Sequence, residues 1–412
     1  MKAWERLIEY VKIPTASCES SSTVPSTKEQ LVLAEKLKKE LEELGLEARM
    51  DQFGYVYGVL PATEGYENRP VLGWIAHMDT VADFTEHPVK PVIHSHYDGE
   101  DLTLGDCGRV LSPAMFPHLK ALRGRTLITS DGTTILGADD KAGIAEIMTM
   151  LEEIIQTEMP HGRIPVAFTP DEEIGCGADH FDLESFGADF AYTMDGGAEG
   201  EIEYENFNAA GVTIRIRGVN VHPGDAKDVM INAALVGMEF SSLLPELETP
   251  AHTEGYEGFY HLTEYKGDVS LAELCYIIRD HDYGKLLEKK AFLESCTARL
   301  NEKYGEGTVS MEWKEQYRNM SEKLTESMHL ITNARMAAVQ ANCTPVTKPI
   351  RGGTDGARLS FMGLPCPNLG TGGYAFHGPY EHITAEGMDK TVRMMIHLVE
   401  IYTGSGNMDC SH

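Results

Sequence analysis

The chain has 412 residues, and its 64 Asp and Glu residues outnumber its 35 Lys and Arg residues, which gives a formal net charge of −29. A surface this acidic repels phosphate backbones and anionic lipid, so neither nucleic acid nor a membrane is expected as a partner. No apolar run approaches the roughly 20 residues that cross a bilayer. The N-terminus mixes charged with apolar residues and lacks the pattern of a secretory signal, which predicts a cytoplasmic protein.

The first two hundred residues alternate helical and strand-like segments. A short amphipathic helix ends before Pro14, and an S-x-x-E capping box at Ser26 and Glu29 predicts the start of a second helix that Gly45 ends. A third helix is predicted over residues 141–156. Strands are predicted at 55–60, 71–76, 164–168 and 190–194. This alternation predicts an α/β domain with a mostly parallel sheet flanked by helices.

The pattern changes near residue 206. Residues 212–217 alternate between apolar and polar side chains, as a one-sided antiparallel strand does. Helical segments at 228–244 and 284–303 follow, and then a strand-like segment at 308–313. We therefore expect a smaller α+β domain over residues 207–318. It is inserted into a catalytic domain made of residues 1–206 and 319–412.

Acidic residues and a histidine follow the predicted buried strands. His77 and Asp79 follow the strand at 71–76, Glu172 and Glu173 follow the strand at 164–168, and Asp195 follows the strand at 190–194. Ligands of α/β proteins gather at the carboxyl ends of the strands, so these side chains are expected to lie together. Histidine and carboxylate groups are ligands suited to zinc.

Each of these residues also has an ordinary structural interpretation. A histidine after a strand is commonly a hydrogen-bonded structural residue, and Glu172 with Glu173 reads equally well as a solvated acidic loop. Asp139 and Asp140 precede the helix at 141–156 and could simply cap it. Their joint placement favours a metal site, because converging carboxylates repel one another unless a cation lies between them.

Longer sequence blocks resemble those of a known enzyme family. The blocks H-x-D-T at His77, L-G-A-D-D-K-A-G at 136–143, F-T-P-D-E-E at 168–173 and D-G-G at 195–197 are similar to the co-catalytic zinc peptidase family that includes carboxypeptidase G and bacterial dipeptidases. The blocks N-V-H-P-G, T-E-G-Y-E-G-F-Y-H-L, Y-I-I-R-D and P-I-R-G-G-T-D-G-A resemble the tripeptide aminopeptidases of that family, nearly end to end.

The resemblance implies two zinc ions per chain and assigns their ligands. His77 and Asp195 would hold one ion, Glu173 and His377 the other, and Asp139 would bridge both.

Two assignments have rivals a few residues away. Asp140 is the alternative to Asp139, and His382 is the alternative to His377. The family pattern favours Asp139 and His377, and it also implies a cis peptide bond between Asp139 and Asp140.

The resemblance also implies three catalytic residues. Asp79 would accept the imidazole proton of His77, Glu172 would act as the general base, and His222, in the inserted domain, would stabilise the oxyanion.

Two arginines are candidates for binding the carboxylate of a substrate, namely Arg279 and Arg351. A structural ion pair is the alternative for each of them.

The expected function is hydrolysis of the first residue from an unblocked tripeptide. A dipeptidase or an N-acyl amino acid deacylase of the same family is the alternative, and a non-catalytic scaffold is a third interpretation, which the complete ligand set disfavours. Manganese or cobalt can occupy such ligands in place of zinc. The expected partners are short peptides. The inserted domain is expected to move as a lid, and a homodimer formed through it is compatible with the resemblance.

Overall fold

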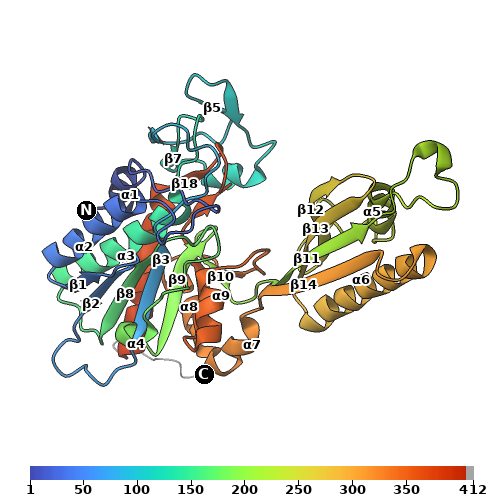
Figure 1. The fold of residues 1–412 in the computed structure, drawn as a ribbon. Helices are drawn as coiled ribbons and strands as arrows, with labels where there is room; N and C mark the ends of the chain where they lie inside the picture. The colour runs from blue at the N-terminus through green and yellow to red at the C-terminus, as the bar shows by residue number, and fades with distance from the viewer. Residues whose placement is uncertain (405–412) are drawn as a thin grey trace. The chain divides into compact units, whose positions relative to one another are not determined.

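The computed structural model describes residues 1–404, and these form two compact units (Figure 1). The first unit contains Met1–Tyr204, Lys323–Lys348 and the chain from Thr354 onward, and the second contains Glu205–Glu322 and Pro349–Gly353. Residues 405–412, the end of the predicted second catalytic segment, lie outside the described residues. No helix in the described part of the chain is long and apolar enough to cross a bilayer.

In the described residues, the first unit is built on an eight-stranded sheet in the order β1-β2-β8-β3-β9-β16-β10-β15. The neighbours β8, β3, β9 and β16 run parallel, whereas β1, β2 and β10 add antiparallel pairings. The strands are β1 (Glu47–Met50), β2 (Val56–Leu60), β3 (Leu72–His77), β8 (Ile164–Thr169), β9 (Phe190–Gly196), β10 (Glu201–Glu203), β15 (Val346–Thr347) and β16 (Asn368–Gly370).

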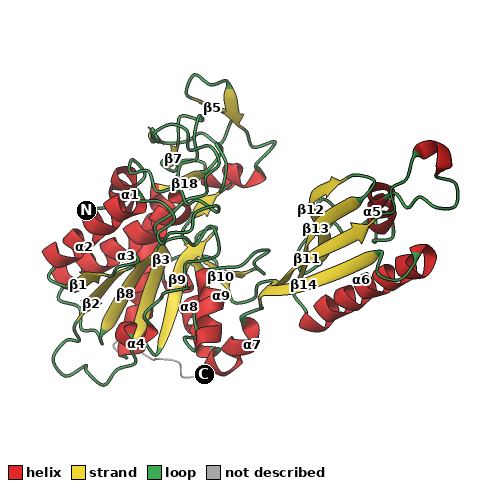
Figure 2. Ribbon diagram, in the orientation of Figure 1, coloured by secondary structure: helices red, strands yellow, loops and turns green. Residues whose placement is uncertain are grey.

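Helices cover both faces of this sheet (Figure 2). On one face, α3 approaches so closely that a Cβ atom added to Gly143 would lie 2.0 Å from the carbonyl oxygen of Met194. On the other face, Phe186 of α4 and Leu359 of α9 pack against Ile75. The helices of this unit are α1 (Ala3–Tyr10), α2 (Gln30–Glu43), α3 (Ala138–Gln156), α4 (Leu183–Phe186), α8 (His329–Gln340), α9 (Asp355–Met362) and α10 (Ala385–Thr403).

A second, smaller sheet of the first unit is absent from the sequence prediction. Its order is β17-β18-β7-β4, and a separate hairpin pairs β5 with β6. These strands have only two or three residues each, too short to show a clear period of two: β4 (Val92–His94), β5 (Leu102–Leu104), β6 (Arg109–Leu111), β7 (Leu127–Thr129), β17 (Gly373–Tyr374) and β18 (His382–Thr384).

The second unit is a four-stranded antiparallel sheet in the order β12-β13-β11-β14. The alternate residues Val212, Ile214 and Ile216 of β11 point into its apolar core, as their period of two predicts. Its elements are β11 (Asn208–Arg217), β12 (Phe259–Gly267), β13 (Leu271–Asp280), β14 (Val309–Tyr317), α5 (Ala233–Ser242) and α6 (Tyr283–Tyr304), and the short helix α7 (Ser321–Leu324) follows β14.

The predicted fold class is confirmed: an α/β domain with a mostly parallel sheet accompanies a smaller α+β domain. One local prediction is wrong. Helix α2 begins at Gln30 with Glu29 as its N-cap residue, so Ser26 does not cap it. The hydroxyl of Ser26 instead donates to the carboxylate of Asp171, a tertiary partner that local spacing does not reveal.

Candidate active site

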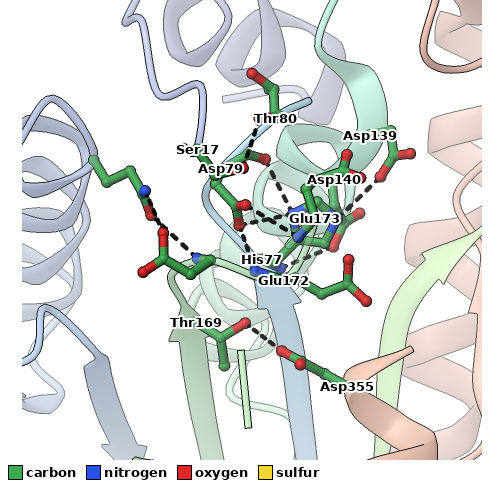
Figure 3. A network of polar contacts seen from close by, with 12 residues as sticks. Ser17, His77, Asp79, Thr80, Asp139, Asp140, Thr169, Glu172, Glu173 and Asp355 are labelled. Atoms are coloured by element: carbon green, nitrogen blue, oxygen red, sulfur yellow. Dashed lines mark hydrogen bonds and ion pairs between the residues drawn. The ribbon is translucent and has the colours of Figure 1, made fainter. Parts of the chain in front are cut away.

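The ends of three adjacent parallel strands lie next to one another and carry several of the predicted metal ligands and catalytic residues. Figure 3 shows His77, Glu172 and Glu173 among them. His77 ends β3, Asp195 lies near the end of β9, and Glu172 with Glu173 occupies the turn after β8. Asp139 lies at the start of α3. Because neighbouring parallel strands end at the same edge, residues up to 118 positions apart in the chain come within contact.

The carboxylate of Asp139 lies between two histidines. Its Oδ1 is 3.0 Å from Nε2 of His77, and its Oδ2 is 3.0 Å from Nε2 of His377. Nε2 of His77 also lies 3.4 Å from Oδ1 of Asp195, and Nε2 of His377 lies 3.3 Å from Oε2 of Glu173. Each histidine therefore shares Asp139 and has one carboxylate of its own.

Ligand atoms converge in two overlapping groups within the described residues. In one group, atoms of His77, Glu172 and Asp195 lie within 4.8 Å of one another, and in the other, atoms of His77, Asp139 and Glu173 do so. The two groups together contain five side chains, and the family resemblance assigns all five to metal ligation or catalysis.

The site has unusual proton affinities. Burial raises the pKa of Glu172 well above its ordinary value, and the charge of Asp195 raises it further. Burial opposes the protonation of His77, but the carboxylates of Asp195, Asp139 and Asp79 together hold its pKa well above the ordinary value. Hydrogen bonds to Asp139 and Glu173 raise the pKa of His377 to about 11. The carboxylates thus stabilise positive charge between them.

A metal cation fits this arrangement. Oε1 of Glu173 is buried and has no hydrogen-bond partner among the described residues. No Lys or Arg of residues 1–404 forms an ion pair with Asp139, Glu173 or Asp195. Nδ1 of His77 lies 3.0 Å from the carbonyl oxygen of Asp79, and donation there leaves Nε2 as the ligand atom.

The carboxylate of Asp79 contacts the turn that carries the two glutamates. Its Oδ1 accepts a hydrogen bond of 2.9 Å from the backbone N–H of Glu172, and its Oδ2 accepts one of 3.1 Å from that of Glu173. Oδ1 also lies 3.5 Å from Nδ1 of His77, farther away than the carbonyl oxygen of Asp79 itself. Asp79 therefore connects the ends of β3 and β8.

Glu381 is a residue of the site that the sequence did not indicate. Its Oε2 accepts hydrogen bonds of 2.7 Å from the N–H groups of Leu136 and Gly137, and its Oε1 accepts one of 3.0 Å from that of Asp139. It therefore holds the backbone that presents Asp139. The only feature of the sequence that could have indicated Glu381 is its position next to His382.

The two rival candidates have different contacts from those of Asp139 and His377. The carboxylate of Asp140 accepts a hydrogen bond from the backbone N–H of His77, whereas the two histidine rings contact Asp139. His382 is buried, and its ring contacts Tyr380 and His118 instead of the acidic cluster. The peptide bond between Asp139 and Asp140 is cis, as the family resemblance implied.

His222, Arg279 and Arg351 belong to the second unit. His222 is exposed, and its Nδ1 accepts a hydrogen bond from the N–H of Gly224, which leaves the proton of a neutral ring on Nε2. Arg279 donates to the carbonyl oxygens of Ile278 and Ala210, and its guanidinium lies over the ring of Tyr317.

Arg351 forms hydrogen bonds with the loop at residues 253–257 of its own unit. Its guanidinium donates to the carbonyl oxygens of Gly255 and Glu257 and to Oγ1 of Thr253. It also lies over the rings of Phe207 and Phe259.

Histidine and carboxylate side chains clustered at the carboxyl edge of a mostly parallel sheet define the class of this protein as a metal-dependent hydrolase. A family model described as Peptidase family M20/M25/M40 matches residues 132–401. Peptidase T of Caldanaerobacter subterraneus subsp. tengcongensis is 52% identical over 408 residues, which cover 98% of this chain and 100% of that protein. Peptidase T of Alkaliphilus oremlandii is 52% identical and covers 97% of this chain, with 98% of its own length matched.

Solved structures show the same fold. The aminopeptidase PepT from Bacillus cereus matches with a TM-score of 0.77 at 23% identity and covers 97% of this chain and 98% of its own. A tripeptidase from Staphylococcus aureus matches with a TM-score of 0.77 at 22% identity and covers 98% of each chain. The chain belongs to peptidase family M20/M25/M40 and, within it, to the peptidase T group.

Proposed function

We propose that the chain is a tripeptide aminopeptidase that removes the first residue from unblocked tripeptides, with two zinc ions and Glu172 as general base. The observation that supports this most is the carboxylate of Asp139, whose two oxygens each lie 3.0 Å from a different histidine, as a bridging ligand requires. The 52% identity to proteins named peptidase T supports the choice of substrate.

Five side chains would hold the two ions. His77 and Asp195 would bind one, His377 and Glu173 the other, and Asp139 both. Histidine nitrogens with carboxylate oxygens suit zinc, and the same set accepts manganese or cobalt. When bound, the ions would supply Lewis-acid chemistry, which polarises the scissile carbonyl and makes the attacking water easier to deprotonate.

Glu172 would transfer the proton during the reaction. A carboxylate oxygen of Glu172 lies within 4.8 Å of the ligand atoms of His77 and Asp195. Burial and the charge of Asp195 raise its pKa in the metal-free site. A cation bound at the neighbouring ligands would offset the charge of Asp195, and the ionised carboxylate of Glu172 would then accept the proton of the attacking water. The same group would then return the proton to the leaving amine. Asp79 orients it through the backbone N–H of Glu172.

His222 would donate a hydrogen bond to the developing oxyanion, because Nδ1 already accepts from Gly224 and Nε2 carries the proton. We expect His222→Ala to lower kcat on the order of 10²–10³-fold, as loss of one oxyanion donor does. Metal content should stay unchanged, and metal analysis beside steady-state kinetics checks both. A variant with wild-type turnover would remove His222 from the mechanism.

The proposed substrate specificity depends on the two charged ends of an unblocked peptide, its amino group and its carboxylate. The acidic site suits the amino terminus, and Arg279 or Arg351 would bind the carboxylate. Both arginines also contact their own unit, so this role requires some of those contacts to be exchanged.

We expect N-acetylation or C-terminal amidation of a tripeptide to lower kcat/KM sharply, because each leaves a charged group of the enzyme unpaired. Turnover of matched di-, tri- and tetrapeptides, free and blocked, measures this. Preference for dipeptides or for N-acyl amino acids would instead identify the dipeptidase or deacylase of the family.

The remaining expectations about partners and location are parts of this proposal. Residues 207–318 would act as a lid, and a homodimer would form through the same region. The cytoplasm is the expected location. Size-exclusion chromatography with light scattering tests the dimer, and cell fractionation tests the location.

A further inference from the structure

The turn that carries Glu172 and Glu173 begins with a residue whose backbone is in an uncommon conformation. Asp171 has a φ of 59°, in the left-handed region that few residues other than glycine adopt, and only 1% of its surface is exposed. Such a conformation persists where the surroundings enforce it. The contacts of Asp171 therefore decide how the next two residues leave strand β8.

Those contacts come almost entirely from one distant segment. Oδ2 of Asp171 accepts a hydrogen bond of 2.7 Å from the N–H of Ser26. Its Oδ1 accepts one of 2.5 Å from the hydroxyl of Ser26 and one of 2.7 Å from the side-chain amide of Gln30. Gln30 returns a bond, since its Oε1 accepts from the N–H of Asp171 at 3.2 Å. Ser26 and Gln30 are themselves 8% and 0% exposed.

The same segment also contacts the chain just after strand β3, at Thr80. Ala16 forms a parallel bridge with Thr80, and the N–H of Ser17 donates to the carbonyl oxygen of Thr80 at 3.0 Å. The hydroxyl of Thr27 donates to the carbonyl oxygen of Ala16, which closes the segment on itself. Residues 15–30 thus touch the chain just after both strands from which His77, Glu172 and Glu173 project.

The turn is held from two sides. Asp79 accepts from the backbone N–H groups of Glu172 and Glu173, and Asp171 is held by Ser26 and Gln30. Removing the second support leaves Asp171 with a buried, unpaired carboxylate, which relaxes by rotating the turn. A displacement of about 1 Å at a catalytic group can cost on the order of 10²-fold in rate.

We propose that Ser26 and Gln30 are positioning residues, which act through Asp171 to aim Glu172 at the substrate water and Glu173 at its metal ion. This inference rests on the proposed function. The inference gives a role to the buried polar side chains of Ser26 and Gln30, which bond to Asp171 and to no proposed metal ligand.

The variants that test it are Ser26→Ala and Gln30→Leu, each in the full chain. We expect either one to weaken metal binding or lower kcat by about 10–100-fold, as the loss of residues behind metal ligands typically does. KM should change much less than kcat. Ser26→Thr keeps the hydroxyl and should restore both properties.

Ser360→Ala is the matched control. Ser360 is also buried, and its hydroxyl donates to the carbonyl oxygen of Gly356 and accepts from the N–H of Cys366, in helix α9. Ser360→Ala removes a buried hydroxyl, as Ser26→Ala does, so a general loss of stability caused by removing such a group appears in this control too. Thermal unfolding of all the variants confirms that each is folded at the assay temperature.

Competition with a chelator measures metal affinity without any substrate, so it tests the positioning role even if wild-type protein fails to cut unblocked tripeptides. That failure alone would overturn the proposed function. The positioning role is overturned if Ser26→Ala and Gln30→Leu match Ser360→Ala in both metal affinity and kcat. It is also overturned if Ser26→Ala lowers kcat as much in a Glu172→Gln background as it does alone, while metal affinity is unchanged.

Discussion

Replacing Glu172 with Gln should lower kcat by about 10²–10⁴-fold, the usual cost of losing a general base. The amide has nearly the same shape but cannot take a proton from the attacking water. The backbone N–H of residue 172 still donates to Asp79, so the turn should keep its place. Metal analysis should find the same content as in the wild-type protein, because the proposed ligands are unchanged.

Glu146→Gln offers a matched control for this experiment. Glu146 is a fully buried glutamate of helix α3, and neither of its carboxylate oxygens has a hydrogen-bond partner among the described residues. Burial raises its pKa well above the ordinary value, and the amide has nearly the same shape as the carboxyl group that it replaces. Its turnover should match that of the wild type. Near wild-type turnover of Glu172→Gln would exclude Glu172 as the base.

Removing the metals with a chelator should abolish hydrolysis, and zinc should restore it. Metal binding should also depend on pH, because ligands must lose their protons first. In the metal-free site, hydrogen bonds to Asp139 and Glu173 raise the pKa of His377 to about 11, so this ring is protonated at pH 7. A metal ion therefore displaces a proton, and its affinity should fall as the pH falls.

The size of the pH effect follows from the number of protons displaced. Below the pKa, each displaced proton weakens metal binding by about tenfold for each unit of pH. Titration calorimetry in two buffers with different ionisation enthalpies counts the protons directly. Full activity with well below two metal ions per chain, or binding without proton release, would contradict the two-metal site with His377 as a ligand.

The sequence carried much information about the central sheet and its edge. Continuous apolar runs marked strands β3, β8 and β9, because a strand buried on both faces contains little else. The residues directly after such runs lie at one edge of the sheet, so the sequence alone predicted that His77, Glu172 and Asp195 lie close together. The resemblance then placed His377, which no periodicity could have connected with a residue 238 positions earlier in the chain.

Local patterns failed where a polar side chain has a distant partner. Ser26 and Glu29 have the spacing of a capping box, yet Ser26 bonds to Asp171, 145 residues away. No local pattern indicates that the side-chain amide of Gln30 is buried and donates to the same carboxylate. Asp79 was expected to orient His77 with its carboxylate, which lies 3.5 Å from Nδ1 of His77. The structure adds two hydrogen bonds that local spacing does not indicate, from the backbone N–H groups of Glu172 and Glu173 to the same carboxylate.

By itself, the sequence determined the class of fold and the family and proposed candidate site residues, because burial and secondary structure leave periodic patterns in a chain and few types of side chain bind metal ions. Only the tertiary structure showed which polar groups are hydrogen-bonded to one another. It showed Asp139 between two histidines, Glu381 behind Asp139, and Asp171 held by Ser26 and Gln30. The physical reason is that a hydrogen bond acts over about 3 Å in space and leaves no period along the chain.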